Sequence, residues 1–185
     1  MDEKEAVVIK PERVGFGARV TAFVLDMVIV IVVGGVVGFV FGTMFGVLVG
    51  FKAGIPGATI GGVVGALSGF CLGILLTAIL YELWEGLTGA AAGKSLMGFK
   101  IAREGGAKAE TKTLLFRYVL KNSWMLLAFL GAFLRSRFCS DLGLLAGLII
   151  FVGCFFVLGV KRQAFHDTLA KTAVFHGADV VDPKE

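Results

Sequence analysis

The sequence predicts an all-α integral membrane protein with four transmembrane helices, a glycine-zipper hairpin first, and a small cytoplasmic β-hairpin. Of its 185 residues, 57% are hydrophobic, whereas a soluble globular domain is about 45–50% apolar. Long apolar segments alternate with charged ones, and ten glycines recur at intervals of four within the apolar segments. These three observations indicate a single membrane domain over residues 1–185.

The chain begins with a charged segment, 1–15, which is the expected cytoplasmic tail. No cleavable signal peptide is expected, because the first apolar segment begins too late and runs too long. The first transmembrane helix is predicted over 16–50, with a length of about 50 Å against about 30 Å for the hydrocarbon core. Its first two turns, which hold Arg19, are therefore expected among the headgroups, and the remainder has room to tilt.

The second transmembrane helix is predicted over 58–81, after a turn around Pro56. The two helices carry the ten regularly spaced glycines. These are Gly34, Gly38, Gly42, Gly46 and Gly50, then Gly57, Gly61, Gly65, Gly69 and Gly73. A spacing of four places each set on one slowly winding stripe, which lets membrane helices approach closely. Glycine is common in membrane helices generally, but two unbroken runs that match in antiparallel register favour a packing seam.

A polar cytoplasmic linker is predicted over 86–113, just after Trp84, which suits an interfacial anchor. Within it, 96–103 and the glycine pair that follows are typical of a strand and a turn. They predict a small hairpin on the membrane surface. A further short strand is predicted over 168–175.

The third transmembrane helix is predicted over 114–134 and the fourth over 142–160. The fourth has 19 residues without a charge. The third has only 13 uncharged residues, 122–134, which also suits a re-entrant or interfacial segment. We favour a crossing in which Lys121 reaches back to the interface. Residues 161–185 form a second cytoplasmic tail.

The basic residues predict that both termini are cytoplasmic. With four crossings, 15 of the 18 lysines and arginines lie in cytoplasmic segments, and only Lys52, Arg135 and Arg137 lie outside. Three crossings would move the C-terminal basic residues outside, so the charges also favour four. The expected location is the plasma membrane. The expected partner is the lipid bilayer rather than nucleic acid, because the basic residues flank apolar segments and are interleaved with acids.

Arg19 and Asp26 are candidate functional residues at the cytoplasmic end of the first helix. They are seven residues apart and so lie on nearly the same helix face. An ionisable residue as deep as Asp26 is a functional candidate, with Arg19 as its nearest basic partner. Because the axial gap is about 10 Å, a water or another group would have to bridge them. The alternative is an interfacial ion pair that only fixes the depth of the helix.

A second group of candidates lies at the same membrane face. His166 and Asp167 follow the fourth helix, and Lys94 lies in the linker. With Arg19 and Asp26 they could form one polar cluster. Alternatively, Asp167 caps a turn or pairs with Arg162.

Three motifs carry a family resemblance that spans nearly the whole chain. They are Arg19, Ala22 and Asp26 in the first helix, Gly89-Ala-Ala-Ala-Gly93-Lys94 in the linker, and His166, Asp167, Ala170 and Thr172 near the end. In this order they resemble the motifs of the RDD family of bacterial and archaeal membrane proteins, named for one arginine and two aspartates. Ala91 stands where the family usually has threonine, and Lys171 where it commonly has glycine.

The resemblance implies transport of small ions or solutes, and cation/proton exchange has been attributed to some members of the family. The aspartates Asp26 and Asp167 would then carry the ion or proton, with Arg19, Lys94 and His166 around them. Because four helices are few for alternating access, a homo-oligomer is expected. The alternative is a non-transporting membrane scaffold whose cytoplasmic hairpin binds a partner.

No cofactor, metal site or enzyme activity is predicted. The three cysteines are scattered among apolar residues without metal-ligand spacing and are expected to pack as small apolar side chains. His166 and His176 have no further ligand nearby. Gly93-Lys94-Ser95 resembles the end of a phosphate-binding loop, but Thr88 stands where the first glycine belongs. No Ser/His/Asp or Cys/His arrangement suggests nucleophilic catalysis.

Overall fold

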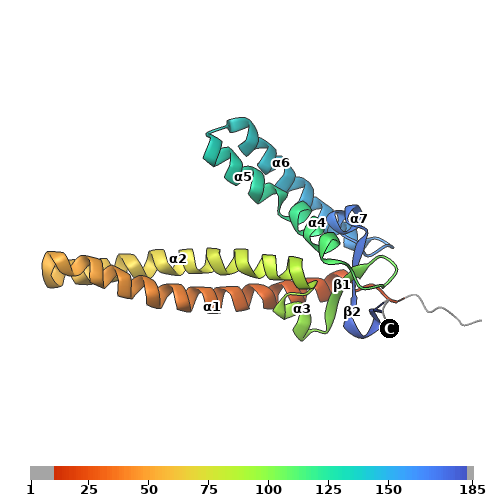
Figure 1. Ribbon diagram of the computed structural model, residues 1–185, viewed down its shortest axis with the longest axis horizontal. Helices are drawn as coiled ribbons and strands as arrows, with labels where there is room; N and C mark the ends of the chain where they lie inside the picture. Colours follow the sequence, from red (N-terminus) through yellow and green to blue (C-terminus); the bar gives the residue numbers. More distant parts are fainter. Residues whose placement is uncertain (1–10, 183–185) are drawn as a thin grey trace, which may run out of the picture.

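The structure, a computed structural model that describes residues 11–182, consists of two helical hairpins that diverge from a common end (Figure 1). The first hairpin contains α1 (Phe16–Gly50) and α2 (Gly54–Thr88). The second contains α5 (Ser123–Leu134) and α6 (Arg137–Cys154). Three of the 15 basic residues that the sequence assigns to cytoplasmic segments lie outside the described residues. They are Lys4, Lys10 and Lys184.

Short elements build the common end, where both hairpins and the described ends of the chain meet (Figure 1). These elements are α3 (Ala92–Leu96), β1 (Phe99–Arg103), α4 (Thr111–Lys121), α7 (Phe165–Leu169) and β2 (Thr172–His176). Three 3₁₀ turns complete the fold, namely η1 (Phe51–Ala53), η2 (Phe155–Leu158) and η3 (Gly177–Asp179).

The first hairpin has the helix α1 that the sequence predicts, but α2 is longer than the predicted 58–81. The chain reverses at Gly54, whose φ of 79° suits glycine. Helix α2 continues to Thr88 and ends at Gly89, which adopts the left-handed conformation and donates its N–H to the carbonyl of Glu85 at 2.9 Å. The helix therefore carries the first residues of the predicted linker to the common end.

The regularly spaced glycines bring the backbones of α1 and α2 into direct contact. A methyl group placed on Gly38 would lie 2.8 Å from Cα of Gly73, and one placed on Gly42 would lie 2.7 Å from Cα of Gly69. Carbon atoms normally pack at about 3.5–4.0 Å. A side chain of any size would therefore force the helices apart. The facing pairs follow the antiparallel register that the spacing predicts, from Gly34 beside Gly73 to Gly50 beside Gly57.

The prediction that the strand within 96–103 forms a hairpin with the segment directly after it is wrong. Strand β1 pairs antiparallel with β2, more than sixty residues later, with Phe99 opposite His176 and Arg103 opposite Thr172. The chain does turn back at Gly106, but it forms only an isolated bridge there, between Ala102 and Lys108. The polar returning segment offers little apolar surface, whereas β2 has four buried residues in a row. The pairing that buries more apolar surface is the one that forms.

A small apolar core fixes this sheet against the first hairpin. Phe99 and Ile101 of β1 and Val174 of β2 are almost fully buried, together with Ala22 of α1 and Leu114 of α4. The core therefore joins elements from both halves of the chain. It positions the end of α1 beside α4 and the sheet.

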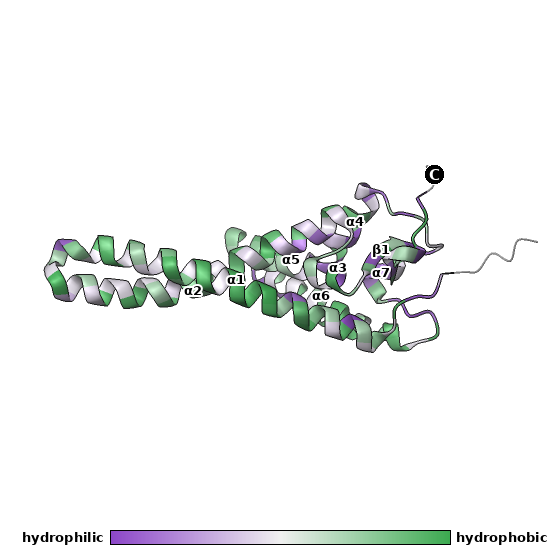
Figure 2. Ribbon diagram, turned by 90° about the horizontal axis from the view of Figure 1, so that it is seen from below, coloured by the Kyte–Doolittle hydropathy of each residue, from purple (hydrophilic) through white to green (hydrophobic). Residues whose placement is uncertain are grey.

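Apolar side chains point outward along both hairpins, as a membrane protein requires. On α1, Phe41 and Phe45 are 68% and 70% exposed. Figure 2 shows hydrophobic residues along the length of α1 and α2. The described residues contain two helical segments long and apolar enough to cross a membrane, Phe16–Thr88, which includes the turn, and Arg137–Leu158.

The predicted third helix, 114–134, is not continuous. Helix α4 ends at Lys121 and α5 begins at Ser123. Between them, Asn122 donates its side-chain amide at 3.1 Å to the carbonyl of Tyr118, which also accepts the backbone N–H of Asn122 at 2.9 Å. The 12 residues of α5 extend about 18 Å. In place of the predicted 142–160, α6 and η2 occupy 137–158.

Candidate functional site

The five ionic residues singled out from the sequence all lie at the common end, but they divide into two groups. Arg19, Lys94, His166 and Asp167 belong to an extended set of buried charges. Asp26 lies apart from these ion pairs. We call the extended set the ion-pair chain. Its members are Arg19, Glu85, Lys94, Arg117, Lys121, His166 and Asp167.

Asp167 is the fully buried centre of the ion-pair chain. Arg19 of α1 donates to one of its carboxylate oxygens at 2.7 Å, and Arg117 of α4 donates to the other at 2.7 Å. Burial alone would raise the pKa of Asp167. The two guanidinium groups outweigh burial and hold its pKa well below the ordinary value. Asp167 therefore stays ionised and joins α1, α4 and α7.

Arg117 extends these contacts to α2. Its Nη1 donates to Oε1 of Glu85 at 3.0 Å, and both side chains are buried. Glu85 also accepts a hydrogen bond from the ammonium group of Lys94, and Lys121 lies 3.6 Å from it. Burial lowers the pKa of Lys94, although Glu85 beside it acts in the opposite direction. Each charge is thus compensated by an opposite charge, as burial demands.

Lys121 also holds α4 to α2. Its ammonium group donates to both carboxylate oxygens of Glu82, at 2.7 and 2.8 Å. Lys121 and Arg117 lie one helical turn apart on α4. Lys121 pairs with Glu82 of α2, and Arg117 pairs with Glu85 of α2. The two helices are therefore connected by successive charge pairs.

Asp26 has a different environment. It is 8% exposed, and its Oδ1 accepts hydrogen bonds from the hydroxyl of Tyr81 at 2.6 Å and from the backbone N–H of Gly93 at 2.7 Å. Both donors are neutral. Among the described residues, no basic side chain forms an ion pair with Asp26, and none donates a hydrogen bond to Oδ2.

The expected link between Arg19 and Asp26 is therefore wrong. Arg19 turns toward Asp167, and it also donates to the backbone carbonyls of Val14 at 3.1 Å and Arg162 at 2.8 Å. The physical reason is the gap of about 10 Å along the helix, which is longer than a direct pair allows. Asp167 and two carbonyl groups offer Arg19 nearer acceptors.

The alternative in which Asp167 pairs with Arg162 is also wrong. Arg162 donates its guanidinium to Glu12 at 2.6 Å and to the carbonyl of Arg13 at 3.1 Å. The other alternative, in which Asp167 caps a turn, corresponds to a long hydrogen bond, because the N–H of Ala164 lies 3.4 Å from the Asp167 carboxylate. The arginines from α1 and α4 dominate its surroundings.

Gly93 lies so close to α1 that its position in the linker motif has no room for a side chain. A methyl group there would lie 2.5 Å from Oδ1 of Asp26 and 2.7 Å from the carbonyl oxygen of Ala22. Ala22 itself has no exposed surface. The backbone of α3 therefore packs directly on α1, and any larger residue would displace the donor that Asp26 uses.

His166 is buried beside Arg117. The guanidinium Nη2 lies 3.3 Å from Nε2 of His166. Because arginine only donates, Nε2 must accept and the ring proton must be on Nδ1, which has no partner among the described residues. Burial first, and then the charge of Arg117, lower the pKa of His166 to about 3. The imidazole is thus neutral near pH 7.

Sequence reasoning missed Tyr81, Glu85, Arg117 and Lys121 as parts of the site. One signal was available for the last three. Acidic residues end α2 at a spacing of three, and basic residues precede the third apolar segment at a spacing of four. Each spacing puts both charges on one helix face. Tyr81 had no such signal, because an aromatic residue near a membrane boundary is ordinary.

The described residues contain no group of three or more His, Cys, Asp or Glu side chains that would suit a metal ion. Four surface pockets flank the common end, and the five predicted site residues line none of them. The candidate site is thus a packed set of hydrogen-bonded charges with one unpaired carboxylate.

Comparison with known proteins identifies the family of the chain. No curated protein and no solved structure matches the chain. The model of the RDD family matches residues 13–171, a range that includes Arg19, Asp26 and Asp167. Because the match covers most of the sequence and contains the arginine and both aspartates, the chain belongs to the RDD family.

Proposed function

We propose that this protein is a multi-pass membrane transporter of small ions, exchanging a cation for protons, in which Asp26 is the ion-carrying group. The observation that supports this proposal is that only one of the two carboxylate oxygens of Asp26 accepts hydrogen bonds from the described residues. Its Oδ1 is held by Tyr81 and Gly93, whereas Oδ2 receives no hydrogen bond from the described residues. A nearly buried carboxylate with only neutral partners can exchange a proton for a cation.

Asp167 is less suited to carrying an ion. It accepts hydrogen bonds from Arg19 and Arg117, and separating a buried ion pair costs about 3–5 kcal/mol. The same argument applies to Glu85, which is surrounded by three basic side chains. We therefore assign these carboxylates to holding the helices in place, and we retain only Asp26 as the carrier.

The proposed topology has four crossings of the plasma membrane and cytoplasmic termini. The crossings are α1, α2, the α4–α5 pair and α6. In this arrangement the common end and Asp26 face the cytoplasm. Because Asp26 lies at the inner boundary and not at the bilayer midplane, where transporters usually bind their substrates, we further propose that a homo-oligomer completes the path.

A second candidate, a non-transporting scaffold, is favoured by the ion-pair chain. Its contacts join α1, α2, α3, α4 and α7 into one unit. Such a unit would hold the two-stranded sheet at a fixed position on the membrane surface, where a partner protein could bind it.

Flux in liposomes separates the two candidates. We would reconstitute the full-length protein with a pH-sensitive dye inside and apply sodium or potassium gradients. Asp26→Asn keeps the acceptor oxygen but removes the charge, so exchange should fall to the level of empty liposomes. The matched control is Asp179→Asn, since Asp179 is exposed in η3, and it should exchange at the wild-type rate.

Two results would count against the carrier assignment. Wild-type exchange by a folded Asp26→Asn variant would remove Asp26 from the mechanism. If the folded wild-type protein moves none of the alkali cations or protons, transport is wrong, and capture of one partner through the sheet would then support the scaffold.

A further inference from the structure

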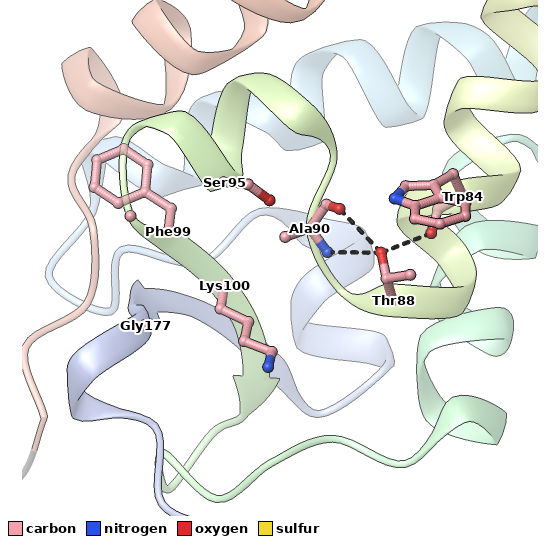
Figure 3. A pocket seen from close by; sticks show the side chains of 8 residues that line it. Trp84, Thr88, Ala90, Ser95, Phe99, Lys100 and Gly177 are labelled. Atoms are coloured by element: carbon pink, nitrogen blue, oxygen red, sulfur yellow. Dashed lines mark hydrogen bonds between the residues drawn. The ribbon is translucent and has the colours of Figure 1, made fainter.

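A pocket of about 410 Å³ lies beside the end of α2, outside the ion-pair chain (Figure 3). Its walls come from the last turns of α2, from α3, from β1 and from the first residue of η3. Thr88 shapes one wall, because its hydroxyl lies 2.8 Å from the carbonyl of Trp84 and 2.9 Å from that of Ala90 and shares its single proton between them. These bonds fix the segment that leaves the helix, so the pocket is part of the folded structure.

Three side-chain donors at this pocket have no partner among the described residues. They are the indole N–H of Trp84, the hydroxyl of Ser95 and the ammonium group of Lys100. In Figure 3 the indole nitrogen and the Ser95 hydroxyl both point toward the space between α2 and α3, and Lys100 extends from β1 along its edge. No acidic side chain is among the residues that line the pocket. Donors and one positive charge without a carboxylate suit an anion with several acceptor oxygens.

The position of the pocket favours an anion that belongs to a lipid. The apolar segment Phe16–Thr88 ends at the pocket wall. Trp84, which lines the pocket, is 61% exposed, and Leu96, next to Ser95 in α3, is 74% exposed, so exposed apolar side chains lie beside the three donors. Tryptophan is enriched at headgroup level, and basic pockets at the cytoplasmic ends of transmembrane helices bind acidic headgroups. A soluble phosphate ester has the same acceptor oxygens but no tails to cover the apolar rim.

We infer that this pocket binds the phosphate of an anionic phospholipid of the inner leaflet, with Lys100, Ser95 and Trp84 as the donors. The inference uses the proposed membrane topology but not the proposed transport. The phosphate is ionised in both lipid classes, but the choline ammonium of a zwitterionic lipid brings a second positive charge close to Lys100, so Lys100 favours an anionic lipid. Trp84 and Ser95 supply hydrogen bonds that any phosphodiester can accept.

Native mass spectrometry of the full-length protein in detergent tests this site. The protein is incubated with phosphatidylglycerol or phosphatidylcholine of the same chain length, and the retained lipid is counted. Phosphatidylglycerol should be retained about five- to tenfold better, as one charge-assisted contact predicts. Lys100→Gln should remove this preference. Lys112→Gln, which removes an exposed charge from the N-terminal turn of α4, should keep it.

A second variant covers the case in which Lys100→Gln does not fold. Trp84→Phe keeps an aromatic ring at the interface but removes the indole N–H, and retention of both lipids should fall about threefold. The inference is overturned if wild-type protein retains the two lipids equally, or if Lys112→Gln lowers the preference as much as Lys100→Gln. It is also overturned if soluble glycerol 3-phosphate displaces the lipid, since the ligand is then a soluble ester. Because no ion gradient is involved, these outcomes are independent of the flux experiment on Asp26.

Discussion

Replacing Gly42 by alanine tests how the first hairpin is held together. Gly42 faces α2 at the middle of the contact, and the added methyl group would meet the carbonyl oxygen of Gly65 and lie 2.7 Å from Cα of Gly69. Both neighbours are backbone atoms of a helix, so neither can rotate away. The helices must therefore separate until the methyl group reaches an ordinary contact distance of about 3.5–4.0 Å. That separation is about 1 Å.

The expected cost follows from the loss of dispersion contacts. A gap of 0.5–1 Å removes about a quarter to a half of the attraction of each contact along the seam. Overpacking of this kind typically costs about 1–3 kcal/mol. Since each kcal/mol changes the Tm of a domain of this size by about 2–4 °C, Gly42→Ala should lower the Tm by about 2–12 °C.

Thermal unfolding in detergent, followed by the fluorescence of Trp84 and Trp124, measures this effect. The matched control is Gly17→Ala in the same helix, because an added methyl group at Gly17 meets nothing within 4 Å. Its Tm should equal or slightly exceed that of wild type. If Gly42→Ala is as stable as Gly17→Ala, the close approach of the two backbones does not stabilise the hairpin.

Two further predictions concern the ion-pair chain. Asp167→Asn should lower the free energy of unfolding by about 3–5 kcal/mol, because Arg117 keeps its buried charge but loses one partner. Glu12→Gln breaks only an exposed pair with Arg162 and should cost less than about 1 kcal/mol; equal losses in denaturant titrations would contradict the assignment. Because the pKa of His166 falls from 6.5 to about 3 on folding, only the unfolded chain binds a proton between these values. The stability that His166 contributes is therefore complete above pH 6.5 and decreases by about 1.4 kcal/mol per pH unit below it. His166→Asn, compared with wild type in titrations from pH 7 to pH 4, should remove this component, and parallel curves would refute the burial of a neutral imidazole.

The first hairpin could be predicted from the sequence because its information is local and periodic. A glycine at every fourth position marks one helix face, and two such runs around a turn define the register in which Gly34 meets Gly73. The motif residues could also be placed at one end of the molecule, because the positions of the basic residues predict which ends of the apolar segments lie together.

Contacts between distant segments could not be predicted in the same way. Nothing within 96–103 shows that its partner is β2, since the choice depends on the apolar surface that each candidate buries. The partner of Arg19 was mistaken for a similar reason. Asp26 is near in the chain, whereas Asp167 becomes near only after α7 folds against α1 and α4.

The two hairpins differ in length, and in the proposed topology this difference affects the thickness of the surrounding bilayer. Helix α1 extends about 52 Å over its 35 residues, whereas the 12 residues of α5 extend about 18 Å before the chain reverses at Arg135. In the proposed topology, lipid acyl chains beside α5 would have to shorten or splay so that the arginines of that turn reach water, while those beside α1 stay extended. The protein would then set a gradient of membrane thickness around itself.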